Sequence, residues 1–141
     1  MKKPFFNPFL AICSLICIQI MGCAETYEQQ FLTFEQAQES ISAGWLPNWL
    51  PITSTDIRFS SNIDTNAVVA AFNVNQDPEW KPQECKEENI QNWVEPQIQT
   101  SWFPKSLVNA VKRGEASYYS CQHSSFLVVH DQSYFYWSLS R

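Results

Sequence analysis

Hydrophobic and polar residues alternate along two neighbouring stretches in the middle of the chain, residues 57–63 and 67–75. A period of two residues is typical of β-strands. Asp64-Thr65-Asn66 lies between the two stretches. Because Asp bonds nearby backbone and Asn tolerates a left-handed conformation, this trio favours a turn. We therefore predict a β-hairpin, with Ile63 held in the core at its corner.

The last part of the chain, after Ala116, shows three further strand-like stretches at residues 117–122, 125–130 and 134–139. They are rich in aromatic and β-branched residues, which favour strands. His123-Ser124 and Asp131-Gln132-Ser133 stand at the turns between them. Five strands in all could form one antiparallel sheet.

Two short stretches have the hydrophobic spacing of helices. The first runs from about residue 33 to 43, with Thr33 as its cap, Gln36 as the capping-box partner and Gly44 as its end. The second precedes Gly114, with basic residues in its last turn. We predict a single small α+β domain: an antiparallel sheet of about four to five strands, two short helices packed on one face, and one disulfide.

Between the first helix and the first strand lies the sequence WLPNWLP. Pro47 and Pro51 each push the preceding leucine toward an extended conformation. The segment could be buried against its own domain, or it could be an exposed binding surface. The candidate partner-binding residues are Trp45, Leu46, Trp49 and Leu50.

The amino-terminal sequence is typical of a secretory signal peptide. Lys2 and Lys3 precede an uncharged apolar stretch that is shorter than the ~20 residues of a membrane-spanning helix. The end of this stretch, Ile20-Met21-Gly22-Cys23, resembles the bacterial lipobox, although Met21 is unusual there. That resemblance implies cleavage before Cys23 and lipidation of its side chain. An ordinary signal peptide cut near Ala24, or an uncleaved anchor helix, would also fit the apolar stretch.

This interpretation sets the expected domain organisation. Residues 1–22 are a lipoprotein signal peptide, residues 23–31 the lipidated amino terminus with a short tether, and residues 32–141 one globular domain. The partner implied by lipid on Cys23 is a membrane. Ala24 does not resemble an inner-membrane retention signal, so in a Gram-negative cell we expect the periplasmic face of the outer membrane.

Five cysteines are present, and the signal peptide and lipidation account for three of them. The remaining pair, Cys85 and Cys121, would be in an oxidising compartment, where a disulfide is expected. Zinc binding together with His123 and His130 is the rival interpretation, but the cysteines lack the close spacing of zinc ligands. Two free buried thiols would be the third possibility. We expect no metal and no cofactor.

The charge balance limits the possible partners. Without Lys2 and Lys3, seven basic residues stand against fourteen acidic ones, which gives a net charge near −7. Nucleic-acid binding requires clustered Lys and Arg, so we exclude it. The acidic stretch from Asp77 to Trp93 is expected to be a solvated face that starts a helix at Asp77-Pro78, although it could also recognise a basic partner.

No set of residues has the sequence signature of a catalytic site. The chain contains histidines, aspartates and serines, but it has no nucleophile-elbow motif and no distinctive pair of carboxylates, such as Asp56 with Asp64. His130 and Asp131 are adjacent, so we expect them to face opposite ways. No catalytic residue is assigned.

The segments WLPNWLPITSTDI, Ile63 to Asn66, Phe72 and the later YYSCQ, FLVV and YFYW together resemble small bacterial lipoproteins related to the YbbD head domain. The resemblance extends from Trp45 to Trp137, with Thr53-Ser54 where a Ser-Ala pair is usual. It implies a secreted α+β module of unknown function, and it implies no catalytic residues.

Two functions from different classes follow. The preferred one is a non-enzymatic lipoprotein of the cell envelope that binds another envelope protein or a cell-wall component, through Trp45 to Leu50 and possibly the acidic loop at residues 84–88. The alternative is a small envelope hydrolase or enzyme inhibitor with Asp64 and His130 as its polar anchors. A shared cleft for Asp64 and His130 would favour the second.

Overall fold

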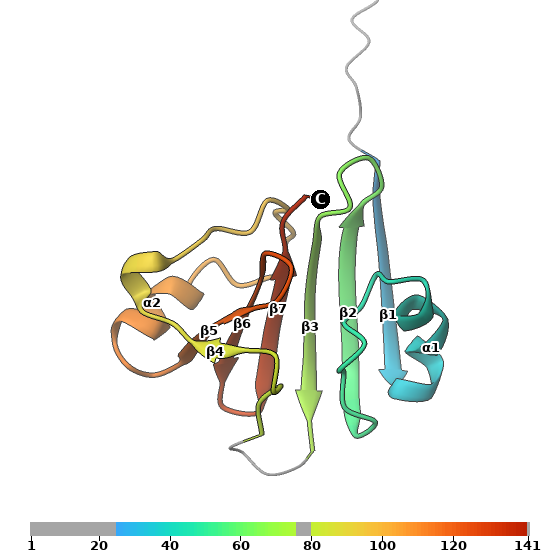
Figure 1. Ribbon diagram of the computed structural model, residues 1–141. Coiled ribbons are helices and arrows are strands. Elements are labelled where there is room, and N and C mark those ends of the chain that lie inside the picture. The colour runs from blue at the N-terminus through green and yellow to red at the C-terminus, as the bar shows by residue number, and fades with distance from the viewer. Residues whose placement is uncertain (1–24, 76–79, 141) are drawn as a thin grey trace, which may run out of the picture.

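The computed structural model describes residues 25–75 and 80–140, which form one antiparallel sheet of seven strands in the order β1-β2-β3-β7-β6-β5-β4 (Figure 1). The strands are β1 (Thr26–Thr33), β2 (Ser54–Asn62), β3 (Val68–Val74), β4 (Lys86–Glu87), β5 (Ser117–Cys121), β6 (Ser125–His130) and β7 (Ser133–Ser138). The helices are α1 (Phe34–Ser42), the 3₁₀ helix η1 (Ile90–Asn92) and α2 (Leu107–Lys112). The α+β class, the antiparallel sheet and the two α-helices are confirmed.

The two α-helices cover opposite faces of the sheet, so the expectation that both pack on one face is wrong (Figure 1). One core cluster joins α1 to Phe59, Phe72 and Tyr136, and the other joins α2 to Val69 and Trp137. The physical reason lies in the central strands, where consecutive residues are both apolar. Side chains of consecutive residues point to opposite faces, so each face of these strands needs a cover.

Two edge strands account for the difference between seven strands and the expected four to five. At one edge, residues 26–33 form β1, which pairs with β2 along its whole length, rather than the expected tether. Phe31 stacks against Phe59 with ring centroids 6.3 Å apart, which anchors this polar strand to the core. At the other edge, β4 is two residues long and pairs with β5.

The hairpin of β2 and β3 forms as expected, but its corner differs in detail. Asn66 has a φ of 57°, the left-handed conformation that Asn tolerates. The backbone N–H of Thr65 donates to the Asn62 side chain at 2.9 Å, so Asn62 provides the side-chain acceptor. Ile63 is 46% exposed, and the expectation that it lies in the core is wrong. It is part of the turn, beyond the end of the regular strand period.

Helix boundaries agree with the sequence signals. Gly44 and Gly114 follow the two α-helices with φ of +82° and +72°, a conformation that costs a residue with a Cβ. Gln36 does reach back over the start of α1. It accepts a hydrogen bond from the Leu32 N–H at 2.9 Å, one residue before the expected partner, Thr33.

The last three strands form a meander, with the predicted boundaries within one residue. His123 and Ser124 have φ of 58° and 55° and belong to the three-residue turn, residues 122–124, that joins β5 to β6. In the acidic stretch, the described residues 80–93 contain β4 and η1 and no α-helix. The predicted helix start at Asp77-Pro78 lies outside the described residues.

The predicted signal peptide, residues 1–22, and Cys23 also lie outside the described residues. Within residues 25–75 and 80–140, neither α1 nor α2 is long and apolar enough to span a membrane.

Candidate functional site

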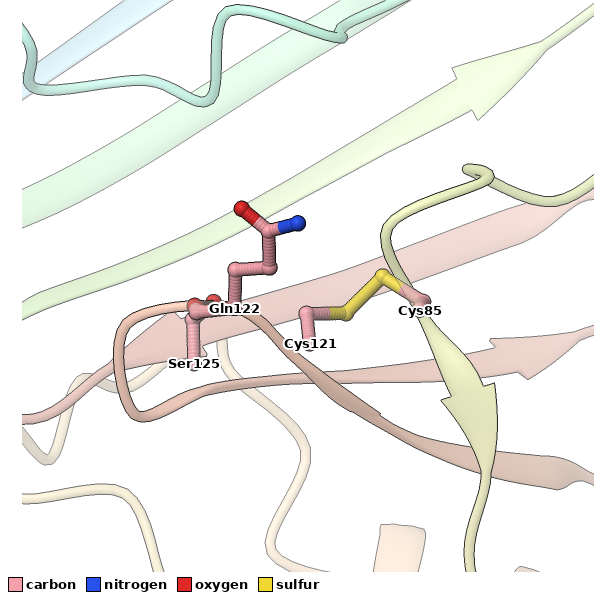
Figure 2. Close-up of a disulfide and its surroundings, with 4 residues drawn as sticks. All are labelled: Cys85, Cys121, Gln122 and Ser125. Atoms are coloured by element: carbon pink, nitrogen blue, oxygen red, sulfur yellow. Dashed lines mark hydrogen bonds between the residues drawn. A yellow bond between two sulfur atoms is a disulfide. The ribbon is translucent and has the colours of Figure 1, made fainter.

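The predicted disulfide between Cys85 and Cys121 is present (Figure 2). Their Cα atoms are 4.1 Å apart, and both residues are buried in the core cluster on the α1 side. The bond joins the end of β5 to the segment before β4. In the part of the chain that the structure describes, no three His, Cys, Asp or Glu side chains are grouped as metal ligands.

The segment from Trp45 to Leu50 packs against its own domain. Leu46 and Leu50 are 3% and 4% exposed, so these two residues cannot contact a partner, and that part of the expectation is wrong. The prolines fold the segment into turns, as shown by the hydrogen bond from the Leu50 N–H to the Pro47 carbonyl at 3.1 Å. Trp45 and Trp49 are only partly buried against the core.

Trp49 lies at the mouth of a cavity of about 340 Å³. Three segments that are distant in sequence form its walls: residues 44–49, the residue before Cys85, and the β5–β6 turn, with β7 as its floor. We call this cavity the disulfide-linked pocket. The side chains that give it its chemistry are Asn48, Trp49, Glu84, Gln122, His123 and Tyr136.

The disulfide brings two walls of the pocket together. Glu84 immediately precedes Cys85, and Gln122 immediately follows Cys121 at the start of the β5–β6 turn (Figure 2). The tight turn places His123 next in line, and the Ser125 hydroxyl closes the turn by donating to the Gln122 carbonyl at 2.5 Å. The covalent bond and the short turn therefore fix the backbone positions from which these polar side chains project.

Tyr136 forms the floor of the pocket, and it is 6% exposed. Its ring meets Trp49 edge-on, with centroids 5.6 Å apart. The neighbouring buried hydroxyls are satisfied: Tyr134 donates to the Trp80 carbonyl at 3.1 Å and Tyr118 to the Asn92 carbonyl at 3.3 Å. In contrast, the Tyr136 hydroxyl makes no hydrogen bond with any other described residue. The hydroxyl oxygen itself is not fully buried, so it is open to the pocket, where it can bond water or a ligand.

Sequence reasoning identified some of these residues but not the pocket. Trp49 was a candidate and Glu84 belonged to the suggested acidic loop. Tyr136 was assigned only to a strand, and His123 only to a turn and to the rival zinc interpretation. The one available signal was the cysteine pair, because a disulfide brings the residues flanking its two cysteines close together.

The polar anchors of the alternative function do not share a site. Asp64 lies in the β2–β3 turn, and His130 ends β6 beside Asp131, at the opposite end of β3. The length of β3 separates them, on the order of 20 Å at ~3.4 Å per residue. Asp56, near the start of β2, is likewise remote from Asp64.

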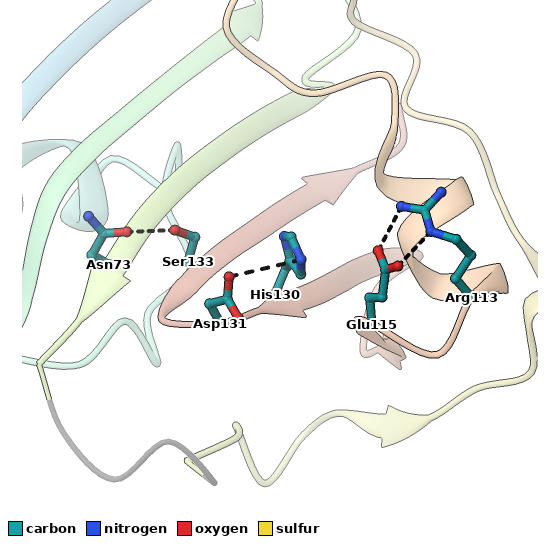
Figure 3. Close-up of polar contacts among 6 residues, drawn as sticks. All are labelled: Asn73, Arg113, Glu115, His130, Asp131 and Ser133. Atoms are coloured by element: carbon teal, nitrogen blue, oxygen red, sulfur yellow. Dashed lines mark hydrogen bonds and ion pairs between the residues drawn. The ribbon is translucent and has the colours of Figure 1, made fainter.

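His130 and Asp131 do approach each other, with Nε2 and Oδ2 4.0 Å apart, so the expectation that they face opposite ways is wrong (Figure 3). Asp131 has a φ of 56° and belongs to a turn, where strand alternation no longer applies. Nearby, the Ser133 hydroxyl donates to Asn73 at 3.0 Å, and Arg113 binds Glu115 through two hydrogen bonds (Figure 3). These contacts occupy the polar side chains of that region with structural partners.

The electrostatic contacts elsewhere are structural as well. Arg58 binds Glu28 across β1 and β2 and stacks over Trp102 at 4.9 Å. The hydrogen bond from Arg58 holds the pKa of Glu28 below its ordinary value, although partial burial opposes this. Burial raises the pKa of Tyr118.

A second cavity, also of about 340 Å³, opens on the α2 side of the sheet. Trp93, Ile98, Phe103 and Leu107 give it an apolar wall, with Glu95 and Lys105 among its polar lining residues. Its two charges are of opposite sign, and the indole N–H of Trp93 is buried without a hydrogen-bond partner among the described residues. The disulfide-linked pocket presents the larger set of hydrogen-bonding side chains.

Comparison with known proteins supports the resemblance noted from the sequence. Residues 25–73 match the family model of the YbbD head domain. The match covers 49 of the 141 residues, from β1 through α1 and the Trp45–Leu50 segment to β3. The later motifs of the resemblance, in β5 to β7, lie beyond the matched residues. No significant match was found among curated proteins or among solved structures.

Proposed function

We propose that this chain is a non-enzymatic lipoprotein of the cell envelope whose domain binds an envelope partner in the disulfide-linked pocket. The observation that carries the proposal is the convergence of Asn48, Glu84 and Gln122 with the partly buried ring of Trp49 around one cavity. These side chains come from three segments that are distant in sequence, and together they offer a ligand both hydrogen-bonding groups and an aromatic surface.

The envelope location rests on the sequence. The lipobox-like Ile20-Met21-Gly22-Cys23 supports lipidation of Cys23, and the disulfide requires an oxidising compartment. Because β1 begins at Thr26, only Ala24 and Glu25 separate Cys23 from the sheet. The domain would therefore sit close to the membrane surface, which we propose to be that of the outer membrane facing the periplasm.

A binding role is preferred to catalysis because the polar side chains of the pocket are not held in place by one another. Neither His123 nor Glu84 makes a side-chain hydrogen bond to another residue in the described ranges, and both are exposed. A general base needs a fixed position against the proton that it removes. Side chains that adjust to a ligand suit recognition better.

The location can be tested by cell fractionation of the full chain, comparing the wild type with Cys23→Ala. We expect the wild type in the membrane fraction. The variant should be retained as an unprocessed precursor or recovered without lipid, since a lipid chain is what anchors it. Metabolic labelling with an alkyne fatty acid is the direct readout, and a wild-type protein without label would refute lipidation.

Binding in the pocket can be tested with a photo-crosslinking amino acid placed at His123 in living cells. A matched control carries the same amino acid at Ile52, which is 74% exposed and outside the pocket. We expect a reproducible adduct from position 123 only. Adducts of equal yield from both positions, or none from position 123, would contradict a binding role for the pocket.

A further inference from the structure

We propose that the ligand of the disulfide-linked pocket is a neutral sugar unit of a glycan. This inference rests on the proposed function, because it names the ligand class of the same site. The size of the cavity, its aromatic wall, its donors and acceptors and its charge each narrow the choice.

The cavity is of the right size for one or two sugar rings. Its volume of about 340 Å³ is at the lower end of the ~300–1,000 Å³ typical of small-molecule sites. An extended protein strand or a helix would need a longer groove. A mono- or disaccharide unit at the end or along a glycan chain fits this space.

Aromatic and polar side chains line the pocket together. Trp49 and Tyr136 provide ring surface, and Asn48 and Gln122 provide amides that both donate and accept. A sugar ring likewise combines apolar and polar parts, since its C–H groups form an apolar face and its hydroxyls project around the rim. A purely apolar ligand would leave the amides and the Tyr136 hydroxyl unpaired, which is unfavourable.

The charge of the pocket argues against an anionic ligand. Glu84 is its one acidic residue, and no lysine or arginine is among its lining residues. A carboxylate can accept two hydrogen bonds from neighbouring sugar hydroxyls, and charge-assisted hydrogen bonds of this kind are stronger than neutral ones. A phosphate or an acidic sugar would instead be repelled by Glu84.

Tyr136 gives the inference its most specific contact. Its phenol can donate to a sugar hydroxyl from the floor of the cavity while Trp49 packs against the ring. Because the phenol has no described protein partner, the bond to the sugar replaces no existing protein bond. Removal of this one oxygen should therefore weaken sugar binding with little effect on the fold.

The test uses the full lipidated protein in a sugar-free zwitterionic detergent and isothermal titration calorimetry. The probes are N,N′-diacetylchitobiose, cellobiose and maltose as neutral sugars, glucose 6-phosphate as an anion and cadaverine as a cation. We expect saturable binding of at least one neutral disaccharide and none of glucose 6-phosphate. Saturable binding of cadaverine or glucose 6-phosphate without any disaccharide would overturn the sugar assignment.

Matched variants locate the binding. Tyr136→Phe and Glu84→Gln should each weaken the disaccharide about five- to tenfold, the loss of one good hydrogen bond. Tyr134→Phe, the neighbouring tyrosine with a bonded hydroxyl, and Glu87→Gln, in the same acidic stretch but outside the pocket, should leave affinity unchanged within about twofold. Equal effects of variants and controls would overturn the assignment.

The cross-linking experiment at His123 separates the two proposals. An adduct that a glycosidase removes supports both the binding role and the sugar. An adduct with a protein, combined with no disaccharide binding, overturns the sugar and leaves the binding role standing. No adduct and no disaccharide binding overturn both.

Discussion

Removal of the disulfide should cost this domain a large share of its stability. The bond closes a loop with a sequence separation of 36 residues. In the chain-entropy description, such a loop restricts the unfolded chain enough to stabilise the fold by about 3.8 kcal/mol at 25 °C. Since small domains have a total stability of about 5–15 kcal/mol, the loss should be easy to measure.

The perturbation is the double variant Cys85→Ala/Cys121→Ala. Alanine is preferred to serine because both positions are buried, and a serine hydroxyl would need a partner there. Urea unfolding followed by tryptophan fluorescence should show a transition midpoint lower by about 2 M, for a typical slope near 2 kcal/mol/M. The slope itself should rise, because the unfolded chain becomes more expanded.

Reduction of the wild type with dithiothreitol is the control, and it should give the same midpoint as the double variant. A loss below about 1 kcal/mol would refute the reasoning, since it would mean that the unfolded chain is hardly restricted by the bond. The same reduction should lower the affinity of the pocket for its ligand, because Glu84 and Gln122 flank the two cysteines.

Three further predictions concern single residues. Tyr134→Phe should lower the free energy of unfolding by about 1 kcal/mol, because it removes a hydrogen-bonded hydroxyl. Tyr136→Phe should change the free energy of unfolding by less than about 0.5 kcal/mol. Urea unfolding of both variants compares them directly. Gly114→Ala should cost about 1 kcal/mol in the same assay, since the φ of +72° strains a residue with a Cβ; no loss would contradict the left-handed helix end. Glu28→Gln should destabilise by about 0.5 kcal/mol at pH 7, the usual value of an exposed ion pair. The folded pKa of Glu28 is lowered, so its contribution exists above the unfolded value near 4.5 and disappears as pH falls through the folded pKa. Unfolding curves of wild type and Glu28→Gln should therefore converge as pH falls below this lowered pKa, and a difference that stays constant throughout the acid titration would refute the pairing.

Local sequence signals determined most of the individual elements. Alternation gave the β2–β3 hairpin and the last three strands because side-chain direction in a strand has a period of two. Gly44 and Gly114 marked the ends of both α-helices, because a left-handed residue ends a helix. Cys85 and Cys121 were the one pair left to form a disulfide in an oxidising compartment.

Tertiary structure decided what depends on partners far away in the chain. Residues 23–31 were predicted to be a tether because their own pattern is mostly hydrophilic. Pairing with β2 makes residues 26–33 a strand. The opposite placement of α1 and α2 follows from the double-sided burial of β3, β6 and β7, and which helix covers which face depends on the assembled sheet. The pocket is the clearest case. Asn48, Glu84 and Tyr136 are far apart in sequence, and they meet only because a disulfide, a tight turn and a central strand converge in space.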